Sequence, residues 1–159
     1  MSYRFPLTEL YRADYNNNSW FFQRPDHRDL YAVSEWYADA VNGSEAWRRR
    51  MYRQLLQEFS ITEKLPQRSG WMVTIANRRV GMLEVLEARH TDIEVFLIAP
   101  SNLLVDEKAA FILWRRAINF LLVLQPWRRL RVHLDLSRDA EARALKKLGF
   151  AKDGDWYTL

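Results

Sequence analysis

Apolar residues change their spacing part of the way along this chain. Between positions 26 and 59 they recur every three or four residues, which predicts two amphipathic helices. Asp26 and Ser44 stand where N-caps belong. Asn42-Gly43 separates the two helices, since glycine tolerates the left-handed conformation that ends many helices. Beyond position 70, alternating patterns and short β-branched runs predict strands.

Three strands are predicted in succession, over 71–76, 80–87 and 92–99. Asn77 and the two arginines that follow it predict a hairpin turn, so the three strands should form an antiparallel meander. A long helix from about Asp106 to Gln125 then leads to an apolar strand near 130–136. Because a helix that links two strands of one sheet makes a right-handed crossover, the strand near 130–136 should run parallel to the strand over 92–99.

The two ends of the chain carry weaker patterns. Residues 1–25 read as irregular, with a short first strand possible from Tyr3 to Leu10. Near the other end, RDAEARALKKLGF predicts a helix with Gly149 as its cap, and the remaining residues predict one or two terminal strands. The sequence shows no internal repeat, so residues 1–159 are expected to form a single domain.

Composition narrows the class of protein. Nearly half of the residues are apolar (48%) and there is no cysteine, which predicts a folded protein without disulfides, as suits the cytoplasm. The most apolar segment contains Arg115 and Arg116, and the N-terminus lacks the apolar run of a signal peptide, so no membrane association is expected. The net charge of +4 permits an anionic ligand but does not by itself indicate nucleic acid.

The order of elements, with Leu148-Gly149-Phe150 after the last helix, resembles the GNAT fold of the Gcn5-related N-acetyltransferases. The resemblance is best from Trp71 to Leu159. It implies a mixed α/β (α+β) fold with a mostly antiparallel sheet and helices on both faces. It also implies transfer of an acyl group, typically acetyl, from acyl-CoA to an amine. No motif in the sequence identifies that amine.

The resemblance further implies where acyl-CoA would bind. In this family the pyrophosphate lies at the N-terminus of the helix that follows the central strand, where unpaired N–H groups and the helix dipole favour an anion. The pantetheine arm pairs with exposed backbone of the central strand, where two parallel strands separate. The corresponding residues of this chain are Leu97, Ile98, Ala99, Leu104, Val105, Lys108 and Arg138.

The loop after the central strand departs from the family's pattern. Leu103 stands where glutamine or arginine is usual, and Leu104, Asp106 and Lys108 stand where small residues are usual. Asp106 and Glu107 also bring negative charge to the start of the helix, which stabilises the helix but opposes a pyrophosphate. A second interpretation therefore stays open: a GNAT-fold protein that has lost catalysis and binds a ligand or a protein partner, with self-association also possible.

The last helix departs from the pattern as well. Leu145 occupies the position of the tyrosine that often protonates the departing thiolate, and Arg138 occupies that of an asparagine. Tyr157 or Tyr11 would have to replace this tyrosine from elsewhere in the fold. Arg138 either binds a phosphate or lies in solvent near the helix start.

Two acidic residues interrupt the apolar strands and are the candidate catalytic bases. Glu94 lies six residues before Pro100, where the resemblance implies a glutamate that deprotonates the amine, and Glu84 on the preceding strand is the second candidate. Burying an unpaired acid is costly, so the alternative is that this face of the sheet is open to solvent or that each acid pairs with an arginine.

The remaining polar residues give weaker indications. His27, His90 and His133 do not form a metal-binding set, so no metal is expected. Arginines alternate with aromatic residues over 47–53 and 126–131, a pattern that nucleic-acid binders share. The arginines of the first segment fall opposite the apolar stripe of their helix, which favours a solvated face and leaves nucleic acid as a remote alternative.

Overall fold

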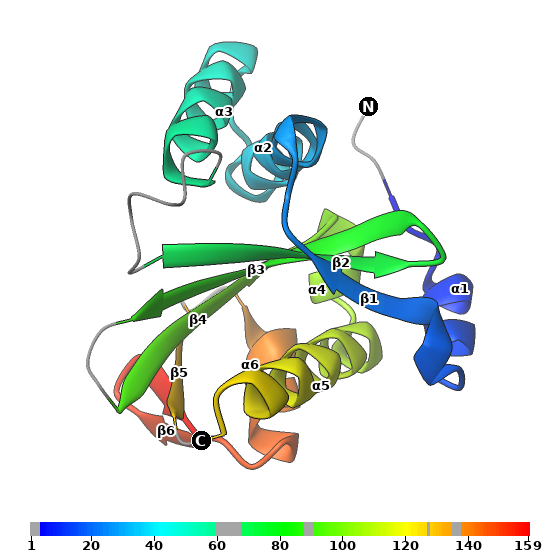
Figure 1. Cartoon of the computed structure of the whole chain (residues 1–159), viewed down its shortest axis with the longest axis vertical. Helices are drawn as coiled ribbons and strands as arrows, with labels where there is room; N and C mark the ends of the chain where they lie inside the picture. The colour runs from blue at the N-terminus through cyan, green and yellow to red at the C-terminus, as the bar shows by residue number, and fades with distance from the viewer. Residues whose placement is uncertain (1–3, 60–67, 88–90, 127, 135–137) are drawn as a thin grey trace.

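The structure is a computed structural model that describes residues 4–59, 68–87, 91–126, 128–134 and 138–159. One seven-stranded sheet, in the order β1-β2-β3-β4-β5-β7-β6, organises the fold (Figure 1). Only β4 and β5 run parallel among these neighbouring strands. The strands are β1 Trp20–Gln23, β2 Arg68–Ile75, β3 Arg78–Glu87, β4 Asp92–Ile98, β5 Arg129–His133, β6 Ala151–Asp153 and β7 Trp156–Thr158.

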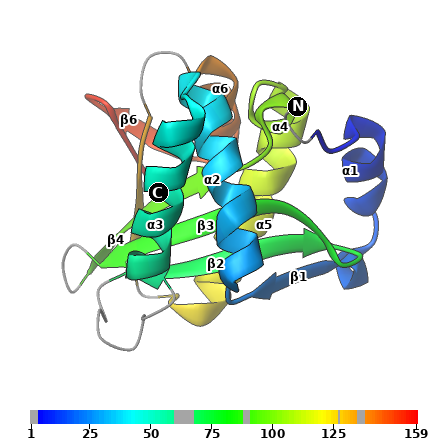
Figure 2. The same ribbon diagram turned by 90° about the horizontal axis from the view of Figure 1, so that it is seen from above.

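Helices cover both faces of this sheet, as the resemblance implied (Figures 1 and 2). One face carries α2 and α3, and the other carries α5 and α6. The helices are α1 Leu7–Ala13, α2 His27–Val41, α3 Glu45–Phe59, α4 Ser101–Leu104, α5 Glu107–Leu124 and α6 Asp139–Lys147, with a 3-10 turn, η1, over Asn17–Ser19.

The sheet separates two apolar cores because side chains alternate between its faces. Met72, Met82 and Ile98 pack against α2 and α3. Odd-numbered residues of β4, together with Val85 of β3, face α5, whose Trp114 is fully buried. Because both of its faces are covered, β4 is apolar at most positions and not only at every second one.

The predicted meander and crossover are confirmed. Strands β2, β3 and β4 are antiparallel neighbours, and α5 connects β4 to the parallel strand β5. The β2–β3 turn lies one or two residues earlier than predicted, since Ala76 and Asn77 carry positive φ angles of 49° and 68°. Arg78 and Arg79 already belong to β3.

The predicted helix caps are largely confirmed. Asp26 caps α2 in a capping box with Asp29, and the Ser44 hydroxyl accepts a hydrogen bond from the Trp47 N–H at 3.1 Å. The left-handed residue after α2 is Asn42, with φ of 57°, and not Gly43. Asparagine tolerates this conformation better than most side chains do.

The prediction of a first strand from Tyr3 to Leu10 is wrong. Pro6 precedes α1, and Leu10 of that helix is fully buried in the core on the α5 side. The first strand is β1, whose Trp20 indole N–H donates to the Ala13 carbonyl at 2.9 Å. This strand forms because it pairs with β2, which is more than forty residues away in sequence.

The segment around Gly149 directs the chain from α6 into the terminal hairpin. Gly149 has a φ of 99°, and the Phe150 N–H donates to the Leu145 carbonyl at 3.0 Å, which closes the helix end. Phe150 is then buried, and β6 and β7 follow as an antiparallel pair. The predicted terminal strands are therefore confirmed, with β7 placed against β5.

Candidate functional site

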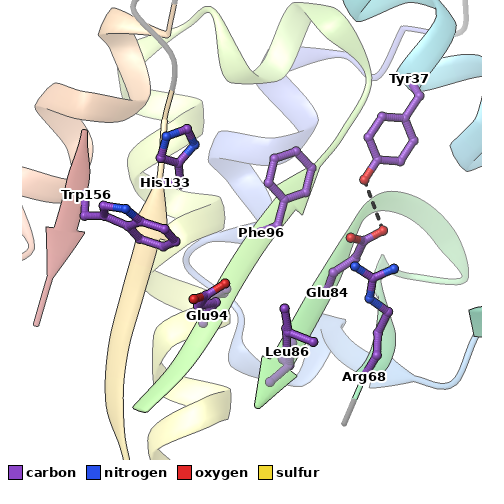
Figure 3. A pocket seen from close by; sticks show the side chains of 10 residues that line it. Tyr37, Arg68, Glu84, Leu86, Glu94, Phe96, His133 and Trp156 are labelled. Carbon is purple, nitrogen blue, oxygen red and sulfur yellow. Dashed lines mark hydrogen bonds between the residues drawn. The ribbon is translucent and has the colours of Figure 1, made fainter. Parts of the chain in front are cut away.

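A pocket of about 290 Å³ opens on the α2–α3 side of the sheet, over β3, β4 and β5 (Figure 3). Both predicted bases, Glu84 and Glu94, line it. Their side chains share this face because they occupy even-numbered positions of adjacent antiparallel strands, where Glu84 pairs with Phe96 and Glu94 with Leu86. The other labelled lining residues are Tyr37, Arg68, Leu86, Phe96, His133 and Trp156.

Glu84 is held by a residue from the helical layer. The Tyr37 hydroxyl of α2 donates a hydrogen bond to the Glu84 carboxylate at 3.0 Å (Figure 3). Burial raises the pKa of Glu84 to about 7, although the Tyr37 hydrogen bond and the charge of Arg68 act in the opposite direction. A carboxyl group with this pKa gains and loses a proton near neutral pH.

Tyr37 remains a hydrogen-bond donor under the same conditions. Its pKa lies above the ordinary tyrosine value, mainly because the hydroxyl is buried and then because of the nearby Glu84 charge. Its ring lies parallel to that of Phe96, with 6.0 Å between the centroids. The three-and-four spacing between positions 26 and 59 includes Tyr37 among the apolar positions, and nothing in that local pattern shows that its hydroxyl meets Glu84.

Glu94 lies on the side of the pocket away from Tyr37, towards Trp156 (Figure 3). It stands opposite Arg131 in the parallel β4–β5 register. Arg131 lies over the Trp156 ring at 4.3 Å from its centroid, and the His133 ring lies 5.1 Å from the same indole. The pocket therefore places two carboxylates between aromatic walls from α2, β4 and β7 (Figure 3).

Strands β4 and β5 separate beside this pocket. Their pairing runs from Asp92 with Arg129 to Val95 with Val132, and β4 continues beyond it to Ile98. Arg138, at the start of α6, donates a hydrogen bond to the Leu97 carbonyl at 3.1 Å. Among the described residues, the paired stretch of β4 and β5 therefore ends before Leu97, and the Arg138 guanidinium bonds to β4 beyond that point.

The start of α5 is occupied by an acid. The Asp106 carboxylate accepts hydrogen bonds from the Ala109 N–H at 2.9 Å and from the Tyr11 hydroxyl at 2.6 Å. The hydrogen bond to Asp106 is the main reason that the pKa of Tyr11 rises to about 12. Glu107 pairs with Arg143 and Lys147 of α6.

The other residues predicted to bind the cofactor have mixed environments. Ile98 and Ala99 are buried, in the cores on opposite faces. Leu104 is half-buried, whereas Val105 is 76% exposed. The Lys108 ammonium lies 4.3 Å from the centroid of the Tyr11 ring, on the surface near the α5 start. None of these contacts assigns a cofactor role to the side chains.

In this arrangement two contacts among the described residues oppose the binding of acyl-CoA. The Asp106 carboxylate takes the position at the α5 N-terminus where the resemblance puts a pyrophosphate, and it is fixed there by two hydrogen bonds. The Leu97 carbonyl already accepts a hydrogen bond from Arg138. Of the two tyrosines considered as proton donors, Tyr11 donates its hydroxyl hydrogen bond to Asp106, and Tyr157 is buried in the core on the α5 side.

The described residues show neither a metal site nor a membrane span. Within those ranges, no three histidines or acids gather as metal ligands would, and His90 lies outside the described residues. Every helix that the structure describes is too short or too polar to cross a bilayer.

Comparison with known proteins identifies the fold. No model of a known protein family and no curated protein sequence matches this chain significantly. Solved N-acetyltransferases do match in structure. Spermidine N-acetyltransferase SpeG from Vibrio cholerae, solved with CoA and spermine, superposes with a TM-score of 0.67 at 14% identity, covering 89% of this chain and 94% of its own.

Two further solved structures agree. Mycobacterium smegmatis RimJ, in complex with CoA-disulfide, gives a TM-score of 0.68 at 12% identity and covers 88% of this chain and 81% of its own. Campylobacter jejuni N-acetyltransferase PseH gives 0.60 at 15% identity, covering 88% and 95%. The chain therefore has the GNAT fold, a mixed α/β fold with a mostly antiparallel sheet.

Proposed function

We propose that this chain is a GNAT-type N-acyltransferase that uses acyl-CoA and takes the proton of its amine acceptor on Glu84. The observation that carries the proposal is the environment of Glu84, which lines the pocket, accepts a hydrogen bond from Tyr37 and has a pKa near 7. A general base works best when its pKa lies close to the operating pH. The GNAT fold supports the reaction class by analogy only.

The pocket residues have separate tasks in this proposal. The acceptor enters as an ammonium ion and gives one proton to Glu84, which frees its nitrogen lone pair. Acyl-CoA would supply the thioester carbon that this nitrogen attacks; the C–S bond would break, and the second N–H proton would pass to the departing thiolate, which leaves as free thiol. Tyr37 orients the carboxylate. Glu94, which the sequence made the first candidate base, faces the same pocket and takes second place here; it also attracts a cation.

The acceptor that suits this pocket is a small cationic amine. Two carboxylates attract the positive charge, and the rings of Tyr37, Phe96 and Trp156 provide faces on which a cation or its alkyl chain packs. SpeG, solved with spermine, is one amine-binding protein of this fold, and a dodecameric form of SpeG is known. We propose self-association of this chain from the same structural similarity to SpeG.

A second candidate function is a binding module without catalysis. It is favoured by the two contacts that oppose acyl-CoA, namely the Asp106 carboxylate at the α5 start and the Arg138 hydrogen bond to Leu97. Under this alternative the pocket binds a cationic ligand or a protein amine without modifying it.

The test is release of free thiol from acetyl-CoA in the presence of a panel of small primary amines and diamines. We expect an amine-dependent rate that Glu84→Gln lowers by roughly 100-fold or more, because a positioned general base contributes about that much. Glu94→Gln, assayed in parallel, shows whether the second acid shares the role.

The matched control is Glu87→Gln, which removes an exposed acid of the same strand whose carboxylate pairs with Arg128 outside the pocket. It should leave the rate unchanged. Absence of amine-dependent thiol release from the natural protein would contradict the enzyme proposal and favour the binding module.

A further inference from the structure

The separation between β4 and β5 leaves a strand edge that a ligand can use. Adjacent parallel strands present their carboxyl ends on the same side of a sheet, and ligands of open α/β sheets bind in the crevice at such ends. Among the described residues, the β4–β5 pairing ends at Val95 with Val132, and the Leu97 carbonyl beyond it accepts a hydrogen bond from Arg138. An extended chain with amide groups binds such an edge as an added strand does.

Arg138 occupies this edge in the structure. One nitrogen of its guanidinium donates to both the Leu97 carbonyl at 3.1 Å and the Glu141 carboxylate at 2.9 Å. The guanidinium also lies 5.1 Å from the centroid of the Phe96 ring, and the side chain is 19% exposed. Arg138 thus lies beside the pocket that contains Phe96.

A buried partner holds the guanidinium in place. Glu141 is 1% exposed and forms an ion pair with Arg138 through both carboxylate oxygens. It also accepts a hydrogen bond from the Trp114 indole N–H of α5 at 3.0 Å. Because a buried carboxylate must stay paired, this network fixes Arg138 at the start of α6.

We propose that Arg138 is an internal latch, whose hydrogen bond to Leu97 takes the backbone position that an amide-bearing arm of acyl-CoA needs. Acyl-CoA then binds only when the guanidinium leaves the Leu97 carbonyl. This inference rests on the proposed function in so far as acyl-CoA is the ligand. It differs from both sequence-based alternatives, in which Arg138 either binds a phosphate or lies in solvent near the helix start.

The latch lowers the apparent affinity in proportion to the time that it is closed. A ligand that binds only the open state has its affinity reduced by the open fraction, so a latch that is open for about one tenth of the time weakens binding about tenfold. Removing the latch should therefore raise the apparent affinity by the same factor, without any new contact to the ligand.

The test compares acetyl-CoA affinity, measured by calorimetry, in the natural protein and in the double variant Arg138→Ala/Glu141→Gln. The glutamine avoids an unpaired buried charge and keeps an acceptor for Trp114, so the double variant is preferred to Arg138→Ala alone. We expect its affinity to be about tenfold tighter, following the open-fraction argument. Glu141→Gln alone shows what the loss of the ion pair contributes.

The matched control for charge is Arg49→Ala, since Arg49 is an exposed arginine of α3 that pairs only weakly with Glu45 at 3.5 Å. Circular dichroism verifies that each variant is folded. A second readout is the Trp114 indole N–H signal in NMR spectra of the natural protein, which should shift as acetyl-CoA is added because the network beyond Arg138 rearranges.

Each outcome bears on the latch. Tighter binding by the double variant, with a shift of the Trp114 signal, supports it. Equal affinities overturn the latch while leaving the proposed function intact, and weaker binding by the variant overturns it in favour of a ligand contact by Arg138. If neither the natural protein nor any folded variant binds acetyl-CoA, Arg138 is not what prevents binding, and the latch is overturned. The thiol-release assay then decides the proposed function separately.

Discussion

At the scale of single residues, the environment of Glu84 decides what the pocket can do. A glutamate in water is ionised well below neutral pH, whereas burial in the pocket raises the pKa of Glu84 to about 7. Tyr37 limits this rise by donating to the carboxylate. The pair therefore keeps a carboxyl group that exchanges its proton at neutral pH, which is the property that the proposed reaction requires.

This pKa predicts how stability depends on pH. Because the folded-state value lies above the ordinary 4.5, the folded protein binds this proton more tightly than the unfolded chain does. The stability that Glu84 contributes is full below pH 4.5 and is lost as the pH rises towards 7. Glu84→Gln should therefore gain stability relative to the natural protein between pH 5 and pH 8, by at most about 3 kcal/mol.

Thermal unfolding of both proteins at pH 5 and pH 8 measures the effect, with Glu87→Gln as the exposed control on the same strand. Parallel pH dependence of the natural protein and Glu84→Gln would show that Glu84 titrates at the same pH in both states, contrary to this prediction.

At the scale of the element, α5 begins in a way that favours the helix over an anionic ligand. Asp106 accepts from the Ala109 N–H and complements the positive end of the helix dipole. Tyr11 of α1 donates to the same carboxylate, so the cap also links α1 to α5. The features that stabilise this helix start are thus the ones that oppose a pyrophosphate there.

Substitutions of Asp106 separate capping from charge. Asp106→Ala should lower the free energy of unfolding by about 0.5–2 kcal/mol, because the cap is lost. Asp106→Asn retains a capping oxygen and should lose less. If acyl-CoA binds at this terminus, the asparagine variant should also bind it a few-fold more tightly, since one charge at a helix end is worth roughly 0.3–1 kcal/mol.

Chemical denaturation and acetyl-CoA titration of the two variants measure these effects. An asparagine variant that is as unstable as the alanine variant would show that the cap depends on charge and not on the hydrogen bond. Unchanged affinity in Asp106→Asn would argue that the pyrophosphate does not lie at the α5 start.

At the scale of the whole molecule, one sheet carries a core on each face. Leu30 of α2 is fully buried in one core, and Leu113 of α5 is 1% exposed in the other. The same strands supply residues to both, as β4 does with Ile98 on one side and Leu97 on the other. Loss of either core therefore removes support from the strands that the other core needs.

This shared sheet predicts a single cooperative unfolding transition, as expected for one domain. Leu30→Ala and Leu113→Ala should each lower the free energy of unfolding by about 2–5 kcal/mol, through lost burial and the cavity left behind. Leu122→Ala is the control, since Leu122 of α5 is 37% exposed and should cost less. Calorimetry that resolves two transitions, each sensitive to one substitution, would contradict a single domain.

Much of the fold was predictable because burial imposes a local period. The nearly continuous apolar run of β4 and the three-and-four spacing in α2 follow from which sides of each element face a core. Asp26 and Gly149 mark helix ends through local backbone chemistry. The sequence also located Glu84 and Glu94 on strands, because an acid among apolar residues interrupts the pattern.

Only the tertiary structure decided the rest, because it depends on contacts between residues far apart in sequence. Strand β1 exists through its pairing with β2, which no local pattern near Trp20 reveals. The Tyr37 hydroxyl meets Glu84 across 47 positions, and Arg138 meets the Leu97 carbonyl across 41. Side-chain identity gave Arg138 a charge, but the packing of α6 against the separated strands determined what that charge binds.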